Sequence, residues 1–322
     1  MHANIATRNR RPGATLIEVL VAIFLMGIGM LALLTLFPIG VLRMAQAIND
    51  ERAAQASASA VSVANIKDLR HDSSLTSPTD LFKQPDASLT VADPDGRSYG
   101  VFIDPAGWLN ALGAFQSFAG GEKAAPRVLP SFIQTSTGRG LDTLRWFAIN
   151  DDVIFDPDTA LPKPNASSFD RDTRFTYAYL MQRPRLSDAS LVEMSVLVFN
   201  RRPITLRGDL TPAENAYPAS YDTSKNMVTL DFSAPTAVAP TLAAGDWIYD
   251  CSVQNSATNP GTAAPHAYFY RVVSINDLGG NKLQIEVQTP LRGFPANALT
   301  AGRVMVLDGL YEVFEKGAGR LP

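Results

Sequence analysis

An uncharged apolar run of 24 residues, from Val19 to Leu42, constrains this chain more than any other feature. A helix rises about 1.5 Å per residue, so this run would span the roughly 30 Å hydrocarbon core of a membrane. Arg8, Arg10 and Arg11 precede it, and basic residues beside a membrane segment favour the cytoplasmic side. The sequence therefore predicts a single-pass anchor with a cytoplasmic N-terminus.

Glu18 lies at the leading edge of this run. A carboxylate in lipid costs on the order of a few kcal/mol, so an acid in an apolar helix is a functional candidate that needs a partner. Cleavage after Gly13 would turn Ala14 into a free α-amine one helical turn before Glu18. The run also contains three glycines and one proline: Gly27, Gly29, Pro38 and Gly40. They either permit close helix contact or a kink, or are simply tolerated in a membrane helix.

The basic leader, Gly13, Thr15, Glu18 and the apolar run together resemble the prepilin signal of type IV pilins and secretion pseudopilins. In that family a dedicated peptidase cuts after the glycine and methylates the new amine. The stretch 15–22 is most similar to V-type minor pilins and I-type minor pseudopilins. The usual first mature residue is phenylalanine and Ala14 stands here, so the resemblance supports cleavage more strongly than methylation.

The resemblance implies a minor pilin or pseudopilin, a structural subunit of a type IV pilus or type II secretion-like filament. Its implied partners are the prepilin peptidase, other pilin or pseudopilin subunits, an inner-membrane assembly platform and the lipid bilayer. Gly13 and Ala14 would be the processing residues and Glu18 the assembly residue. The protein would lie in the inner membrane with a periplasmic C-terminal domain, then in the filament. A membrane-anchored periplasmic enzyme or binding protein with a pilin-like signal is the alternative.

No motif in the rest of the chain indicates catalysis or a cofactor, so we expect no enzyme activity and no cofactor or metal. Three histidines and one cysteine do not form a zinc pattern, and no phosphate-binding loop or nucleophile elbow occurs. His71 and Asp72 indicate a polar helix end more than a hydrolase fragment, because adjacent helical residues point about 100° apart. Removing residues 1–13 would change the formal net charge from −3 to −6, so nucleic-acid binding is not implied, although a local basic patch stays open.

Two further features each allow a functional and a structural interpretation. Cys251 is the one cysteine and follows a strand-like run, which favours a small buried residue over a reactive thiol. The acidic loops at 93–96, 151–152 and 156–158 lack the ligand spacing of a calcium loop, so solvated turns are favoured over calcium sites.

Helical spacing continues beyond the apolar run and predicts one helix from about residue 15 to residue 69. The stripe that carries this spacing is weak and contains Val41, Met44, Ile48, Ala58, Ile66 and Leu69. Alternation at 175–181 and 192–198 then predicts two strands, similar to the antiparallel sheet that pilin domains pack on their helix. The aromatic row of the first strand would lie under the helix or, alternatively, form a ligand platform.

The last third has the pattern of further strands, which indicates a small sheet or barrel. The expected strands are 227–232, 246–253, 268–275, 282–288 and 303–314, with a hairpin loop at 277–281. The sequence thus predicts an α+β fold. The expected divisions are a leader at 1–13, a helix at 14–72 with its transmembrane segment at 14–42, a pilin-like sheet domain at 73–204 and a C-terminal β-rich region at 205–322.

Overall fold

The computed structural model confirms an α+β fold with a long N-terminal helix followed by β-sheets. The described residues are 15–77, 79–83, 96–104, 126–133, 146–149, 156, 158–159, 161, 164–165, 168–169, 174–202, 215–222, 224–233, 239–256, 263–292 and 298–320. The chain divides into two compact units, Met1–Glu51 and Arg52–Pro322.

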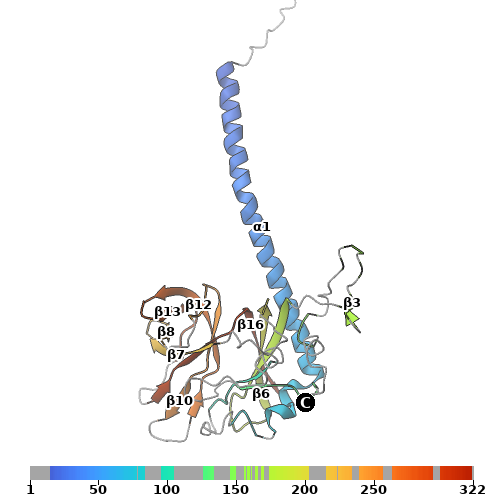
Figure 1. The fold of residues 1–322 in the computed structure, drawn as a ribbon, viewed down its shortest axis with the longest axis vertical. Coiled ribbons are helices and arrows are strands. Elements are labelled where there is room, and N and C mark those ends of the chain that lie inside the picture. Colours follow the sequence, from blue (N-terminus) through green and yellow to red (C-terminus); the bar gives the residue numbers. More distant parts are fainter. Residues whose placement is uncertain are drawn as a thin grey trace, which may run out of the picture. The chain divides into compact units, whose positions relative to one another are not determined.

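Helix α1 spans Leu16–Ile66 and continues through Pro38 (Figure 1). It ends where Asp68 adopts a left-handed conformation with φ of 48°, a backbone state that commonly terminates helices. Two short 3₁₀ helices follow, η1 at Leu69–His71 and η2 at Ser73–Leu75. The predicted helix is therefore confirmed, with an end a few residues earlier than expected.

The buried face of α1 is made of small residues, and the predicted apolar stripe is wrong. The buried helix residues are Ala53, Ala56, Ser57, Ala60 and Ala64. Of the predicted stripe only Leu69 is buried, whereas Ile66 is 78% exposed. Alanine is weakly apolar, so a face that needs small side chains for close packing leaves a faint pattern in the sequence.

A five-stranded sheet forms the centre of the second unit, in the order β16-β6-β5-β1-β2. Its strands are β1 (Val101–Ile103), β2 (Arg127–Val128), β5 (Phe175–Gln182), β6 (Leu191–Asn200) and β16 (Leu310–Arg320). The predicted hairpin is confirmed, because β5 and β6 pair antiparallel with Tyr179 opposite Val196. The pair β1 and β2 is parallel, and the other neighbours are antiparallel.

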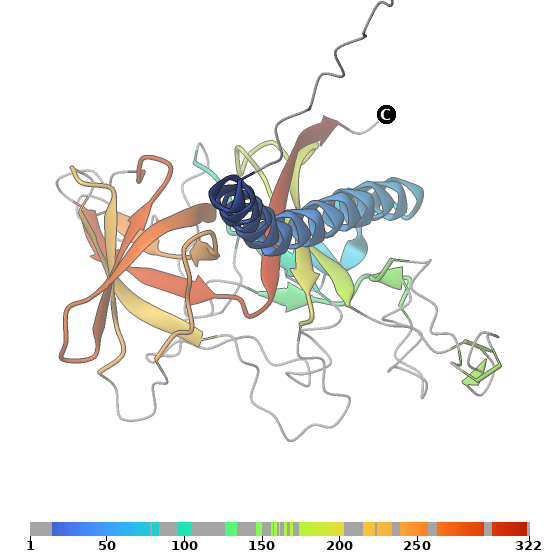
Figure 2. The ribbon, with the colours of Figure 1, turned by 90° about the horizontal axis from the view of Figure 1, so that it is seen from above.

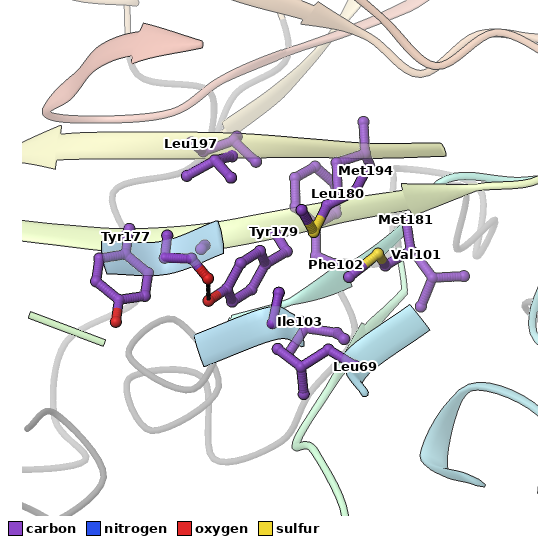
Figure 3. Packing of buried hydrophobic residues seen from close by; sticks show 14 of the residues in the cluster. Leu69, Val101, Phe102, Ile103, Tyr177, Tyr179, Leu180, Met181, Met194 and Leu197 are labelled. Atoms are coloured by element: carbon purple, nitrogen blue, oxygen red, sulfur yellow. Dashed lines mark hydrogen bonds between the residues drawn. The ribbon is translucent and has the colours of Figure 1, made fainter. Parts of the chain in front are cut away.

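Every residue of β5 is buried because both of its faces are covered. On one face the Tyr179 hydroxyl donates to the carbonyl of Ala60 in α1 at 2.7 Å (Figure 3). Tyr179 therefore lies under the helix, whereas the Tyr177 ring packs on Phe147. The whole row is buried, so the ligand-platform alternative is wrong. On the other face, Leu180 lies beside Gly100, and Gly100 is also close to Tyr249 and Ala267 in the last third of the chain.

The last third of the chain closes into a six-stranded barrel, which agrees with the predicted small sheet or barrel. In order around the barrel its strands are β12 (Tyr268–Asp277), β13 (Lys282–Val287), β8 (Met227–Asp231), β7 (Asn215–Asp222), β15 (Arg303–Val306) and β9 (Trp247–Asp250). The predicted hairpin loop joins β12 to β13, where Gly279, Gly280 and Asn281 have positive φ. In Figure 2 the orange and red barrel strands form a group of their own, beside the yellow-green strands of the sheet.

Two predicted strands are each split between different sheets. The stretch 246–253 becomes β9 in the barrel and the start of β10 (Val253–Ser256), which pairs with β11 (Ala263–Pro265) and β14 (Ala298–Ala301). The stretch 303–314 becomes β15 in the barrel and β16 in the five-stranded sheet, with Gly309 at φ 75° in the turn between them. A further two-stranded pair consists of β3 (Pro164–Asn165) and β4 (Ser168–Phe169).

The predicted domain divisions stay a prediction. The path of β16 is relevant to them, because this strand belongs to the C-terminal region but pairs in the first sheet. After the barrel the chain returns to the first sheet and pairs along β6. One hydrophobic cluster also joins helix, sheet and barrel residues, among them Ala60, Tyr179 and Met305. The residues from Arg52 onward therefore share a core, although the barrel has a second core of its own.

Candidate functional site

Thr15 caps the first turn of α1. The backbone N–H of Glu18 donates to the Thr15 hydroxyl at 3.3 Å and to the Thr15 carbonyl at 3.0 Å. Thr15 is thus the N-cap residue, and Glu18 is the third residue of the helix. This Thr-x-x-Glu spacing is that of a capping box, a signal that the sequence interpretation of Glu18 did not use.

The Glu18 side chain is exposed in the first turn of the helix. The helix dipole favours a negative charge at this end. Among the described residues no hydrogen bond or ion pair is recorded for its carboxylate, and Gly13 and Ala14 lie outside the described residues. The geometry therefore leaves Glu18 open to two roles, a capping role within its own helix and pairing with a group outside it.

The first unit presents an apolar helix surface that is exposed among the described residues. Large apolar side chains from Leu16 to Met44 are about half to three quarters exposed, for example Leu34 at 73%. The uncharged segment from Val19 to Leu42 is about 36 Å long at 1.5 Å per residue, enough for the hydrocarbon core. In the described part of the chain α1 is the one helix that is long and apolar enough to cross a membrane. By length and composition this segment is a membrane anchor.

The glycines of this segment have open surroundings. A Cβ atom built on Gly27, Gly29 or Gly40 would meet no atom within 4 Å. These positions are therefore not explained by packing within the chain. They leave the helix backbone accessible to a neighbouring helix, which is a common use of small residues in membranes.

The comparisons with known proteins agree with this N-terminal geometry. The family model described as prokaryotic N-terminal methylation motif matches residues 8–34. The matched segment contains Gly13, Ala14, Glu18 and the first two thirds of the apolar run. The chain therefore carries an N-terminal segment similar to the prepilin signal of type IV pilins. The comparisons with curated proteins and with solved structures gave no match.

His71 and Asp72 have structural contacts. The Asp72 carboxylate accepts hydrogen bonds from the backbone of Ser74 at 2.8 Å and from the backbone and hydroxyl of Ser131. The His71 ring contacts Asp68 instead, at 2.7 Å. The predicted polar helix end is therefore confirmed, because the two side chains point to different partners.

Cys251 is buried, as expected for a small structural residue, and burial raises the pKa of its thiol well above the usual value. A thiol with a raised pKa holds little thiolate at neutral pH, so it is a poor nucleophile. Of the acidic loops, Asp156 and Asp158 form a turn in which the Asp158 N–H donates to Asp156 at 2.8 Å. The loops at 93–96 and 151–152 lie outside the described residues except Gly96, and the described residues contain no group of three or more metal-ligating side chains.

A buried polar network at the barrel wall was not anticipated from the sequence. Asp250 accepts from the Tyr221 hydroxyl at 2.8 Å and contacts the His266 ring at 2.8 Å. The Ser252 hydroxyl is bonded to Tyr221 and to the backbone of Arg303. These bonds tie β7, β9 and β15 together, which gives the network a structural role. Tyr221, Asp250 and Arg303 are far apart in sequence, so no local spacing could have indicated the network.

Proposed function

We propose that this chain is a minor pilin or pseudopilin, a structural subunit of a type IV pilus or type II secretion-like filament. The observation that carries the proposal is the processing signal at residues 8–34 on a helix whose uncharged surface is exposed. The subunit is cleaved after Gly13 by a prepilin peptidase and assembles through α1. It works as a scaffold, without an active site or cofactor of its own.

The proposed route begins in the inner membrane. The arginine-rich leader stays in the cytoplasm, α1 crosses the bilayer, and the unit that begins at Arg52 lies in the periplasm. An inner-membrane assembly platform then moves the processed subunit into the filament, where other pilin or pseudopilin subunits replace lipid around the helix. The stretch 15–22 resembles V-type minor pilins and I-type minor pseudopilins.

Glu18 is proposed to set the register between neighbouring helices. In an apolar bundle a carboxylate either takes up a proton or pairs with a positive charge. The mature amine of Ala14 is the nearest cation that processing creates. A pair within one helix would stabilise each subunit alone, whereas a pair between subunits would fix how far one helix slides along the next.

Substitutions at Glu18 distinguish two roles of its side chain, pairing with a positive charge and capping its own helix. Glu18→Gln keeps a side chain that can complete a capping box but removes the charge, and Glu18→Ala removes both. We expect both variants to be inserted and cleaved normally and to be lost from sheared filaments. Normal incorporation of Glu18→Gln would contradict the pairing role and leave capping as the function of Glu18.

Thr15 provides the matched control for the cap. Thr15→Ser keeps the hydroxyl acceptor, and Thr15→Val removes it at a cost of about 1 kcal/mol in helix stability. We expect Thr15→Ser to assemble normally and Thr15→Val to lose much less incorporation than Glu18→Gln. Equal losses would show that the helix start, and not the charge, limits assembly.

Fractionation tests the filament itself. Recovery of the chain in sheared filaments, together with other pilin-like subunits, is the expected result. Exclusive retention in the membrane fraction at full length would contradict the proposal and favour a membrane-anchored periplasmic enzyme or binding protein.

A further inference from the structure

A polar cleft of about 440 Å³ lies between the five-stranded sheet and the barrel. Its floor and walls come from β5, β6 and β16 of the sheet and from β12 and the segment after β13 of the barrel. The polar and charged side chains that concern us are Arg97, Gln182, Glu193, Tyr268, Arg292 and Glu315. Its volume falls within the roughly 300–1,000 Å³ of small-ligand sites.

The sheet side of the cleft is held rigidly. Arg97 donates to the Gln182 side-chain oxygen through Nε at 3.2 Å and through Nη2 at 2.7 Å, and it also pairs with Glu193. Gln182 is buried and donates in turn to the carbonyl of Ser98 at 2.8 Å. These bonds fix the guanidinium plane of Arg97 before any ligand arrives, which reduces the entropy lost on binding.

The barrel side is built around Tyr268. The Arg292 guanidinium lies 4.1 Å from the centre of the Tyr268 ring, and its Nη1 donates to the Tyr268 hydroxyl at 3.0 Å. The Arg97 guanidinium lies 5.2 Å from the same ring. One aromatic ring thus positions two planar groups that carry several N–H donors each.

The balance of positive and negative side chains that line the cleft indicates which class of ligand it can bind. The charged residues that line the cleft are two arginines and two glutamates, Arg97, Arg292, Glu193 and Glu315. An anion placed here would meet two carboxylates, and a cation would meet two guanidinium groups. A neutral ligand with many hydroxyl groups meets no like charge, and each hydroxyl can both accept from an arginine and donate to a glutamate.

We propose that this cleft is a binding site for a short neutral oligosaccharide. The site lies wholly within the unit that begins at Arg52, so cleavage after Gly13 removes none of its lining residues. It would give the subunit a recognition function in addition to its structural one.

The test uses the full-length protein in lipid nanodiscs, because the sugar headgroups of alkyl glycoside detergents would compete for the cleft. The probes are short neutral hexose oligosaccharides on an array, next to sialylated, sulfated and amino-sugar forms. We expect binding of one or more neutral oligosaccharides and weaker binding of their charged forms. Absence of binding to every neutral probe, or binding of charged probes alone, would overturn the proposal.

Variants then locate the bound sugar. Arg292→Ala and Glu315→Ala each remove one exposed lining group, and we expect each to weaken binding by roughly tenfold or more. Lys316→Ala is the matched control on β16, because Lys316 does not line the cleft. An unchanged melting temperature shows that the variants fold. Folded Arg292→Ala and Glu315→Ala variants that bind as tightly as Lys316→Ala would overturn the assignment.

Discussion

The two parts of helix α1 use apolar residues in opposite ways. Up to Glu51 the helix exposes large side chains such as Leu31 and Leu34, and from Arg52 onward it buries alanines such as Ala56 and Ala60. The first part therefore depends on lipid or on other subunits for its stability. The second part depends on the core of its own chain. Hydrophobicity alone therefore does not decide which residues of α1 are buried within the chain. The weakly apolar alanines are buried because the core of the same chain packs on them.

The largest expected difference is in the free energy of unfolding, between Tyr179→Ala in the core that covers the second part and Leu31→Ala in the first part. Tyr179→Ala removes a buried ring that packs against Phe147 and Tyr177 and donates to α1, so we expect a loss of about 3–5 kcal/mol in the free energy of unfolding. Leu31→Ala should change it by less than about 0.5 kcal/mol. Denaturant unfolding of the full-length protein, followed by tryptophan fluorescence, measures both, because all three tryptophans follow residue 51.

Tyr179→Phe is the control for the hydrogen bond to Ala60. It keeps the ring and should cost about 0.5–1.5 kcal/mol. If Leu31→Ala destabilised the second unit as much as Tyr179→Ala, the distinction between the two parts of α1 would fail.

A pair of glycines sharpens the same comparison at a smaller magnitude. A Cβ at Gly302 would collide with the backbone carbonyl of Ala219 between β15 and β7, so Gly302→Ala must distort the barrel and should cost about 1–3 kcal/mol. Gly27 has open surroundings, and Gly27→Ala should stabilise the helix by about 0.5–1 kcal/mol. Gly302→Ala should therefore lower the melting temperature of the second unit, whereas Gly27→Ala should keep or raise the helix content seen by circular dichroism. A stable Gly302→Ala barrel would contradict the register of β15 against β7.

The two units should also differ in alkaline solution, where only the second unit should lose stability. Burial raises the pKa of Tyr270 to about 12 from its usual value of 10. Between these values the folded state binds more protons than the unfolded state, so the free energy of unfolding falls as pH rises from about 10 through about 12. The segment 15–51 contains no tyrosine and should keep its helix content over this range.

Circular dichroism and tyrosinate absorbance across this range check the expectation. Tyr270→Phe should make the loss of stability shallower. An equally steep loss in that variant would assign the alkaline transition to other groups.

Local patterns in the sequence predicted the elements that depend on local physics. The anchor run, the helix start, the β5–β6 hairpin and the loop at 277–281 all follow from neighbouring residues, and the structure contains each of them. Glu18 was also a candidate from sequence, and the structure adds the hydrogen bond from its backbone N–H to the Thr15 hydroxyl.

Long-range pairing could not be predicted in the same way. The return of β16 to β6, the closure of the barrel and the network around Asp250 join residues far apart in sequence. Strand β7 was missed altogether, and its Pro218 weakens any strand pattern. The covered face of α1 was misassigned because its alanines are less apolar than the exposed Ile66.

The intact mass of the protein extracted from membranes tests whether the chain is a processed pilin-like subunit. We expect a mature chain that begins at Ala14, with or without one added methyl group. A mass that corresponds to an N-terminus at Met1, or to a cut beyond Leu42, would contradict it.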